Sequence, residues 1–129
     1  MRIACRFLGA LLLAVWMPVL VGGLASLRSR GRLGQSEALI VTGAYRYVRH
    51  PLYAGLSMTL TGIGLLFGTW VLALGGLVWL VVTQSWSIHE ERELAQRFGA
   101  EYVSYQQATP GVVPDVARLL RDLLNGRPM

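Results

Sequence analysis

Charged side chains are scarce in this sequence, and lysine is missing altogether. Asp, Glu, Lys and Arg make up 15% of the 129 residues, whereas an ordinary soluble domain carries about 25%. All twelve basic residues are arginines, and hydrophobic residues account for 53%. This balance argues against an ordinary water-soluble domain and indicates an integral membrane protein.

Cysteine is nearly absent as well. Cys5 is the only one, so the sequence holds neither an intrachain disulfide nor a cysteine metal cluster. His50 and His89 lack the spacing of metal ligands, and we expect no metal. The net charge is +5, but the arginines stand between apolar blocks. We therefore expect no nucleic acid partner; the arginines are typical of charges that set membrane orientation and contact anionic lipid.

The first apolar block, residues 7–27, follows Arg2 and Arg6. It is long enough to cross the roughly 30 Å hydrocarbon core of a bilayer. Such a beginning also resembles a signal peptide. The length of the block and the Trp16-Met17-Pro18 interruption favour an uncleaved helix, kinked at Pro18.

An arginine-rich loop over residues 28–50 is expected next, and two more apolar blocks follow at residues 52–67 and 70–87. The loop arginines are Arg28, Arg30, Arg32, Arg46 and Arg49. Arginine beside a span marks the cytosolic side, so this loop should lie inside and the N-terminus outside. Gly68-Thr69 predicts a turn, and the two blocks predict a helical hairpin. Its glycines, which should permit close helix approach, are Gly55, Gly62, Gly64, Gly75 and Gly76.

From His89 onward the pattern changes to that of amphipathic helices. Leu94, Phe98 and Tyr102 recur every four residues, and Glu93 and Arg97 suit an i,i+4 pair. Pro110 and Pro114 should end this region, with Asp115 as the N-cap of a last short helix. That helix should end near Gly126 and lie in the membrane interface. Its apolar stripe comprises Val116, Leu119, Leu120, Leu123 and Leu124.

The most informative segment, residues 43–55, is a loop that becomes a helix at Pro51. Proline suits the first helical turn, whose free N–H groups favour an anion. The surrounding side chains that could bind a ligand are Tyr45, Tyr47, His50 and Tyr53. A plainer interpretation is also open, with the tyrosines as interfacial belt residues and His50 as a simple N-cap.

A second candidate site is Glu90-Glu91, where the third apolar block ends. Charges at this depth are costly unless they are paired or solvated. One interpretation is a polar helix end, and the other is a carboxylate that binds a cation or the ribose hydroxyls of a cofactor. The hairpin should bring this pair back beside His50 and Pro51, so that both could line one cleft.

Together, residues 49–55 (RHPLYAG), Glu90-Glu91 and the FGAEYVSY run at 98–105 resemble the isoprenylcysteine carboxyl methyltransferase and phospholipid methyltransferase superfamily. The resemblance covers residues 38–114. It implies S-adenosylmethionine as cofactor. By position it implies that the cofactor contacts Ala38, Leu39, Ile40, Tyr45, His50, Pro51, Leu52, Tyr53, Glu90 and Glu91. A substrate-binding arginine of the eukaryotic enzymes corresponds here to Trp86, and Gly111 also departs from the family pattern.

The resemblance thus implies a methyltransferase that acts on a lipophilic or membrane-associated thiol, carboxylate or amine. We expect an all-α, multi-pass membrane protein with about three transmembrane helices, in the bacterial inner membrane, whose site faces the cytosol. It would form one domain: a first transmembrane helix (1–27), a cofactor loop (28–51), a hairpin (52–88), and cytosolic and interfacial helices (89–129). Its partners would be a lipid-like substrate and membrane lipids; a homo-oligomer stays open. A nicotinamide-dependent sterol-type reductase, which has a similar Arg-His-Pro-Asn-Tyr segment, and a non-catalytic membrane subunit are the alternatives.

Overall fold

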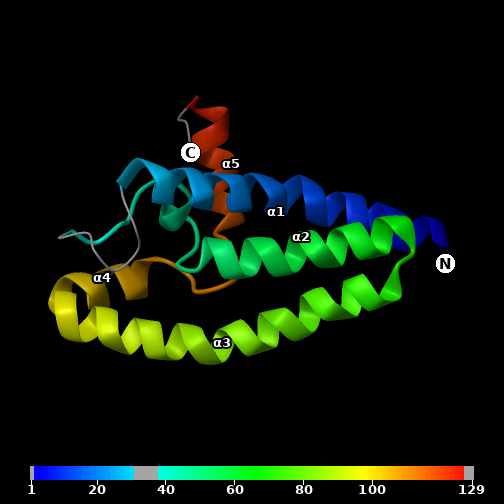
Figure 1. The fold of residues 1–129 in the computed structure, drawn as a ribbon. Helices are drawn as coiled ribbons and strands as arrows, with labels where there is room; N and C mark the ends of the chain where they lie inside the picture. Colours follow the sequence, from blue (N-terminus) through cyan, green and yellow to red (C-terminus); the bar gives the residue numbers. More distant parts are fainter. Residues whose placement is uncertain (1, 31–37, 127–129) are drawn as a thin grey trace.

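The computed structural model describes residues 2–30 and 38–126, and within these ranges every regular element is helical (Figure 1). The prediction of an all-α chain is confirmed for this part of the protein. Arg32, one of the loop arginines, lies outside the described residues. The elements in order are α1 (Arg2–Arg30), the short 3-10 helix η1 (Gly43–Arg46), α2 (Pro51–Phe67), α3 (Trp70–Phe98), α4 (Ala100–Ala108) and α5 (Val116–Leu124).

Helix α2 lies between α1 and α3, packs against both, and runs antiparallel to each (Figure 1). Only Gly68 and Thr69 separate α2 from α3, and Gly68 adopts a left-handed conformation with φ 75°. Glycine occupies this conformation at no steric cost, which is why the chain turns here. Beside the turn, a Cβ at Gly64 would collide with the backbone of Ala73.

The packing of α1 on α2 also depends on glycine. A Cβ at Gly9 would lie 2.7 Å from the carbonyl oxygen of Gly62, so the two backbones can approach only because both residues lack side chains. Gly75 behaves differently, since nothing lies within 4 Å of a Cβ placed there. The expectation that Gly75 permits a close helix contact is therefore wrong for this chain.

Two predicted boundaries are also wrong. Helix α1 continues to Arg30, so Arg28 belongs to a helix and not to the loop. Helix α3 continues without a break through His89 to Phe98. The charged residues after position 88 do not interrupt hydrogen bonding along the helix. The first residue that does is Gly99, whose φ of 55° directs the chain into α4.

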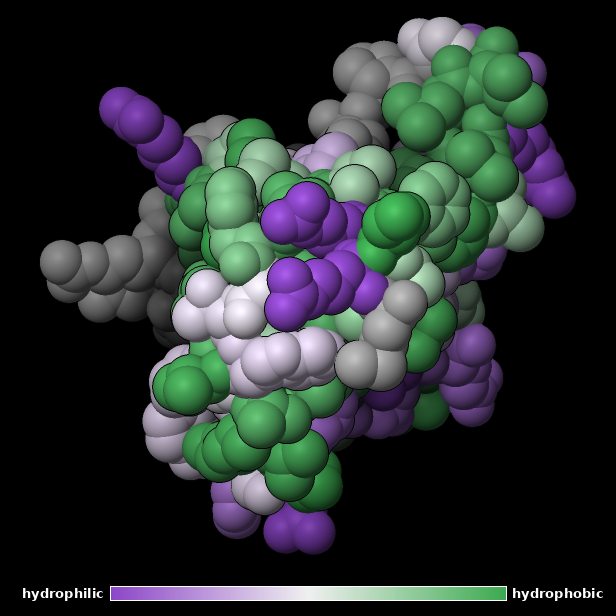
Figure 2. Space-filling model, turned by 90° about the vertical axis from the view of Figure 1, so that its right-hand side faces the viewer, coloured by the Kyte–Doolittle hydropathy of each residue, from purple (hydrophilic) through white to green (hydrophobic). Residues whose placement is uncertain are grey.

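The distribution of polar and apolar side chains is the reverse of that in a soluble protein. Large apolar residues of α1 and α3 are exposed, among them Phe7 at 73% and Val71 at 84%, whereas Ser57 and Thr83 are 0% and 1% exposed. Both buried hydroxyls donate hydrogen bonds to carbonyl oxygens within their own helices. Figure 2 views the end of the molecule that carries the N-terminus and the α2–α3 turn, where hydrophobic and near-neutral side chains surround a hydrophilic cluster.

Two helical segments are long and apolar enough to cross a membrane, Arg2–Arg28 and Trp70–Phe98. The third apolar helix, Pro51–Phe67, is shorter. At the end of the bundle where α2 begins, Trp16 and Val19 of α1 form a small core with Val48 and Ala54. This core fixes the loop before α2 against the helices.

The last helix begins as predicted, because the Asp115 side chain accepts a hydrogen bond from the Arg118 N–H. Its apolar stripe is not packed on the protein, however. Leu119 is 8% exposed, but Leu120 is 54% and Leu124 is 87% exposed. Helix α5 stands out from the bundle (Figure 1).

Candidate functional site

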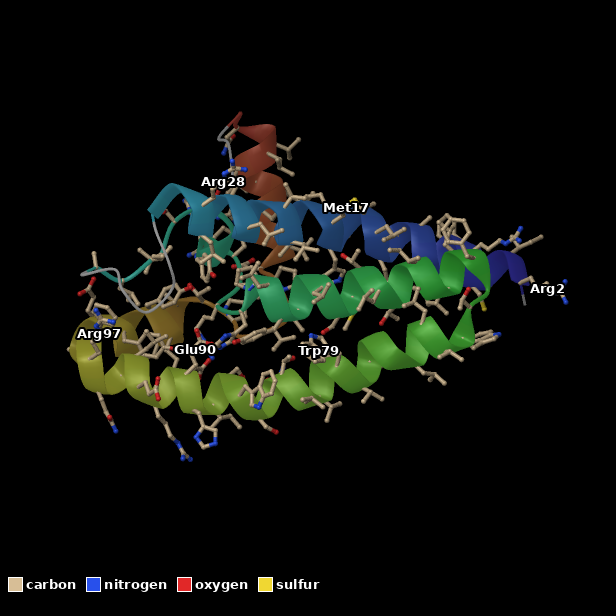
Figure 3. The ribbon with its side chains drawn as sticks, in the orientation of Figure 1. Arg2, Met17, Arg28, Trp79, Glu90 and Arg97 are labelled. Atoms are coloured by element: carbon tan, nitrogen blue, oxygen red, sulfur yellow. The ribbon has the colours of Figure 1, made fainter. Side chains whose placement is uncertain are left out.

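A chamber of about 350 Å³ lies where the loop before α2 meets the end of α3 and the helix α4. This volume is within the range of pockets that bind small molecules. Figure 3 shows Glu90 and Arg97 on the side of α3 that faces the rest of the protein. The residues that line the chamber are Ala38, Leu39, Ile40, Tyr45, Arg49, His50, Glu90, Glu93, Leu94, Arg97, Phe98, Tyr102 and Tyr105.

One wall comes from residues 38–50. Ile40 and Tyr45 are buried at 7% and 8% exposure. Gly43 has φ 66°, and a side chain there would collide with Ser26 of α1, so the tight turn into η1 requires glycine. Behind this wall, the Arg49 and His50 N–H groups donate to the carbonyl oxygens of Pro110 and Gly111 at 2.9 and 3.1 Å. The loop is thus held from both sides.

Arg49 joins three separate segments of the chain. Its Nε donates to Glu91 Oε1 at 3.0 Å, and its Nη2 lies 3.0 Å from the same oxygen. Its Nη1 donates to the carbonyl oxygens of Gln106 and Thr109, each at 2.7 Å. The guanidinium therefore ties the start of α2 to α3 and satisfies carbonyl groups at the end of α4.

His50 is the N-cap residue of α2 by position, but its side chain makes no capping hydrogen bond. Instead, Nε2 lies 2.9 Å from Glu91 Oε1. The ring is 7% exposed and stacks on Tyr53, with centroids 5.8 Å apart. The interpretation of His50 as a simple N-cap is therefore wrong, because its imidazole is committed to α3.

Glu91 is the shared acceptor of this network. Its Oε2 accepts a hydrogen bond from the Gln106 side chain at 2.9 Å. Burial alone would raise the pKa of the Glu91 carboxyl, but the hydrogen bond with His50 and the charge of Arg49 outweigh it and lower the pKa. The carboxylate is therefore ionised at neutral pH and supports the neighbouring residues.

Glu90 is placed differently from Glu91. Its Oε2 is buried and, within the described residues, has no hydrogen-bond partner. His50 Nδ1 lies 3.8 Å from this oxygen, which is beyond hydrogen-bond distance, and the Tyr53 hydroxyl interacts with the Glu90 carboxylate. A buried acceptor without a donor is costly, so this oxygen is ready to accept a hydrogen bond from a ligand in the chamber.

The tyrosines of the chamber remain protonated at neutral pH. Burial, followed by the charge of Glu90, raises the pKa of Tyr45. Burial likewise raises the pKa of Tyr105, and raises the pKa of Tyr102 to about 12 with a contribution from the charge of Glu91. Tyr105 donates its hydroxyl to the Tyr45 carbonyl oxygen at 2.6 Å. These rings therefore supply aromatic surface and neutral hydroxyls, not bases.

The structure brings most of the predicted cofactor residues together, although they come from separate parts of the chain. Those at the chamber are Ala38, Leu39, Ile40, Tyr45, His50 and Glu90. Four predicted cofactor residues do not line it, namely Pro51, Leu52, Tyr53 and Glu91, and neither does Trp86, which was predicted at a substrate-binding position. Pro51 and Leu52 face Gly23 of α1, Tyr53 and Glu91 support His50, and Trp86 is 53% exposed with its ring against Trp79.

Several chamber residues were not among those predicted. They are Arg49, Glu93, Leu94, Arg97, Phe98, Tyr102 and Tyr105. A usable signal was present for those on α3, because residues 3, 4, 7 and 8 positions after Glu90 share its helical face. The spacing of Tyr102 suggested a continuous helix, but Tyr102 lies on α4 beyond the break at Gly99.

Comparison with known proteins identifies the family. Residues 4–101 match the phospholipid methyltransferase family. The chain belongs to this family. The match runs from α1 to the beginning of α4 and includes the loop and the α3 face that build the chamber.

Two curated relatives are isoprenylcysteine methyltransferases. The chain is 32% identical over 82 residues to the protein-S-isoprenylcysteine O-methyltransferase of Schizosaccharomyces pombe, which covers 62% of this chain and 34% of the relative. It is 31% identical over 87 residues to protein-S-isoprenylcysteine O-methyltransferase B of Arabidopsis thaliana, covering 66% and 44%. The matched regions thus span less than half of each relative. No solved structure matches the chain.

Proposed function

We propose that this chain is an S-adenosylmethionine-dependent methyltransferase that acts at a membrane on a lipophilic acceptor with a thiol, carboxylate or amine group. The observation that carries the proposal is the buried, unpartnered Oε2 of Glu90 in an aromatic chamber. Membership of the phospholipid methyltransferase family supports the reaction class.

The chemistry of the chamber suits this cofactor, and its volume of about 350 Å³ is in the range of small-molecule pockets. Glu90 would accept hydrogen bonds from ribose hydroxyls or from the amino group, with its charge complementing the positive charge of the cofactor. Tyr45, Phe98 and Tyr105 offer aromatic surface to an adenine ring and to a sulfonium cation. Ala38, Leu39 and Ile40 line the chamber beside them.

S-adenosylmethionine supplies an already activated methyl group, so the protein need only position an acceptor lone pair in line with it and exclude water. The residues of this chain are suited to that task. Arg49, His50 and Glu91 fix the chamber wall, and the protonated tyrosines add no competing base. No nucleophilic triad is needed for such a reaction.

The membrane placement follows from the surface. We propose that α1, α2 and residues 70–87 of α3 cross the bilayer, because their outer surfaces are apolar and their polar side chains turn inward. His89 and the glutamates after it then lie outside the hydrocarbon. The arginine-rich end, which carries the chamber, faces the cytosol, and the N-terminus faces outward.

The names of the relatives and the residue at position 86 bear on the nature of the acceptor. Both curated relatives are named for isoprenylcysteine, which supports a lipid-like acceptor. Trp86, at the position implied for a substrate-binding arginine, offers an exposed apolar surface and no cation. An acceptor of lower negative charge than a prenylcysteine carboxylate suits this position better.

Ligand binding by the detergent-purified protein tests the proposal. Calorimetric titration with S-adenosylhomocysteine should show binding at a single site. Binding of a reduced nicotinamide dinucleotide instead would favour a membrane reductase. Binding of neither would leave a non-catalytic membrane subunit as the better account.

A further inference from the structure

Helix α5 presents three kinds of surface on three sides. At 3.6 residues per turn, four apolar residues share one side, two residues face the protein, and polar residues occupy the third. The apolar side comprises Val116, Leu120, Leu123 and Leu124, which are 42%, 54%, 53% and 87% exposed. The side toward the protein comprises Leu119 and Asp122, and the polar side comprises Arg118, Arg121 and Asn125.

The rotation of α5 about its own axis is fixed by Asp122. Its Oδ2 accepts a hydrogen bond from the Tyr47 hydroxyl at 2.9 Å and lies 3.5 Å from Arg46 Nη2. Asp122 is 4% exposed, so rotating the helix would separate its carboxylate from Tyr47 and Arg46, which is costly for a buried ion pair. The leucine side must therefore face away from the protein.

The position of α5 along the bundle is also fixed. The Asp115 N–H donates to the Tyr47 carbonyl oxygen at 2.9 Å, which places the beginning of α5 beside the segment that leads into α2 at Pro51. From there α5 runs across the direction of α1, α2 and α3 (Figure 1). If the bundle crosses a bilayer, α5 lies along its surface, at the level where the apolar helices begin.

We infer that α5 docks on an anionic lipid surface, with its leucines at the hydrocarbon boundary and Arg121 at the phosphates, while Arg118 donates a hydrogen bond to the Arg46 carbonyl oxygen at 3.3 Å. This inference rests on the proposed membrane location. The chemistry fits a lipid surface better than a second copy of the chain. The two acidic residues of this region, Asp115 and Asp122, are engaged within the protein, so a symmetric contact would oppose arginines to arginines.

Only a few bonds connect α5 to the proposed cofactor chamber. Tyr47 holds Asp122 and directly follows η1, which carries the chamber residue Tyr45. A helix anchored at the lipid surface would hold this segment in place. Membrane contact would thus support the geometry of the chamber wall.

Spin labels test the docking without any cofactor. In a Cys5→Ser chain, single labels would be placed at Leu123→Cys, at Asn125→Cys as the matched polar-side control, and at Val78→Cys on the exposed side of α3. The proteins would be reconstituted in vesicles of phosphatidylcholine and phosphatidylglycerol. Collisions with oxygen, which enters hydrocarbon, would be compared with those of a water-soluble nickel chelate.

The ratio of oxygen collisions to nickel collisions should be several-fold higher for the labels at positions 78 and 123 than for the label at position 125. If the label at position 78 contacts hydrocarbon but the label at position 123 contacts water, the docking of α5 is overturned and the proposed function stays intact. An aqueous label at 78 would overturn the membrane placement, and the docking with it.

Lipid charge tests the role of Arg121. A basic residue beside an anionic surface strengthens attachment by about fivefold. Omitting phosphatidylglycerol, or substituting Arg121→Gln, should therefore raise nickel access to the label at position 123. Equal access under all of these conditions would overturn the assignment of the lipid phosphates as the partners of Arg121.

Discussion

Glu90 Oε2 lies 3.8 Å from His50 Nδ1, beyond hydrogen-bond distance, although this oxygen atom is buried and His50 is only 7% exposed. His50 is already committed on its other nitrogen to Glu91, at 2.9 Å. The two consecutive glutamates of α3 therefore have separate roles. Glu91 holds the protein together, and Glu90 is available to a ligand.

The first prediction concerns Glu90→Gln. Hydrogen bonds to charged groups contribute about 1.5–3 kcal/mol, so the affinity for S-adenosylhomocysteine should fall by roughly tenfold to a hundredfold. Glutamine keeps the size of the side chain, so the melting temperature without ligand should change little. Calorimetric titration in detergent measures the loss.

The matched control is Glu101→Gln, because Glu101 is exposed on α4 and does not line the chamber. Glu93 is unsuitable, since it is a chamber residue. If the variants at 90 and 101 bind equally well, Glu90 is not a ligand, and the proposal loses its main support.

The second prediction concerns Arg49→Gln. The substitution removes four contacts within 3.0 Å to Glu91, Gln106 and Thr109. It also leaves the carboxylate of Glu91, whose side chain is 18% exposed, without its guanidinium partner. We expect a loss of about 2–3 kcal/mol in the free energy of unfolding, or roughly 5–10 °C in melting temperature. Arg92→Gln, at an exposed position of α3, should melt like the parent. Equal melting of both variants would contradict the role assigned to Arg49.

The sequence predicted α2 and α3 best where it contains a strong helix breaker. The expected turn at Gly68-Thr69 matches the observed boundaries at Phe67 and Trp70. The prediction failed where polar and charged residues resembled the end of a helix. His89 and Glu90 suggested an end, but a helix continues through charged residues when its backbone hydrogen bonds are uninterrupted, as α3 does to Phe98.

The site was predictable in part for a similar reason. The loop residues, His50 and Glu90 carry motifs that can be recognised locally, and they lie at the chamber. Arg49 and Tyr105 belong to the recognisable RHPLYAG and FGAEYVSY segments, but neither was assigned to the site. Their places depend on α4 folding back from Gly99 onto the loop, which is a long-range arrangement that no local pattern specifies.

The third prediction concerns the attachment of α5. Tyr47→Phe removes the 2.9 Å hydrogen bond to the buried carboxylate of Asp122 and should cost about 1–3 kcal/mol. Limited trypsin digestion should then cleave faster at Arg118 and Arg121, because α5 would detach more often.

A double-mutant cycle with Asp122→Asn isolates the contact. If the two residues act through one another, the double variant should be less destabilised than the sum of the single variants, by about 0.5–3 kcal/mol. Strictly additive losses in melting experiments would mean that Tyr47 and Asp122 stabilise the protein independently.

The last prediction is a pH dependence that belongs to Glu91, which lies beyond the proposed membrane span. Its carboxyl is buried, which alone would raise the pKa, but His50 and Arg49 lower it below the ordinary value. The folded protein therefore releases this proton more readily than the unfolded chain. The resulting stabilisation is complete above the ordinary glutamate pKa and is lost as the pH falls through the lowered value.

Melting temperatures across the acidic range would measure this loss. The parent protein should lose stability progressively below about pH 5, where unfolded glutamates begin to bind protons. Glu91→Gln should start from a lower melting temperature at pH 7 and lose less on acidification, because it has no carboxylate to protonate at this position. Glu101→Gln should follow the parent, since Glu101 is exposed. Parallel curves for the parent and Glu91→Gln would show that the ionised Glu91 does not hold His50 and Arg49 in place.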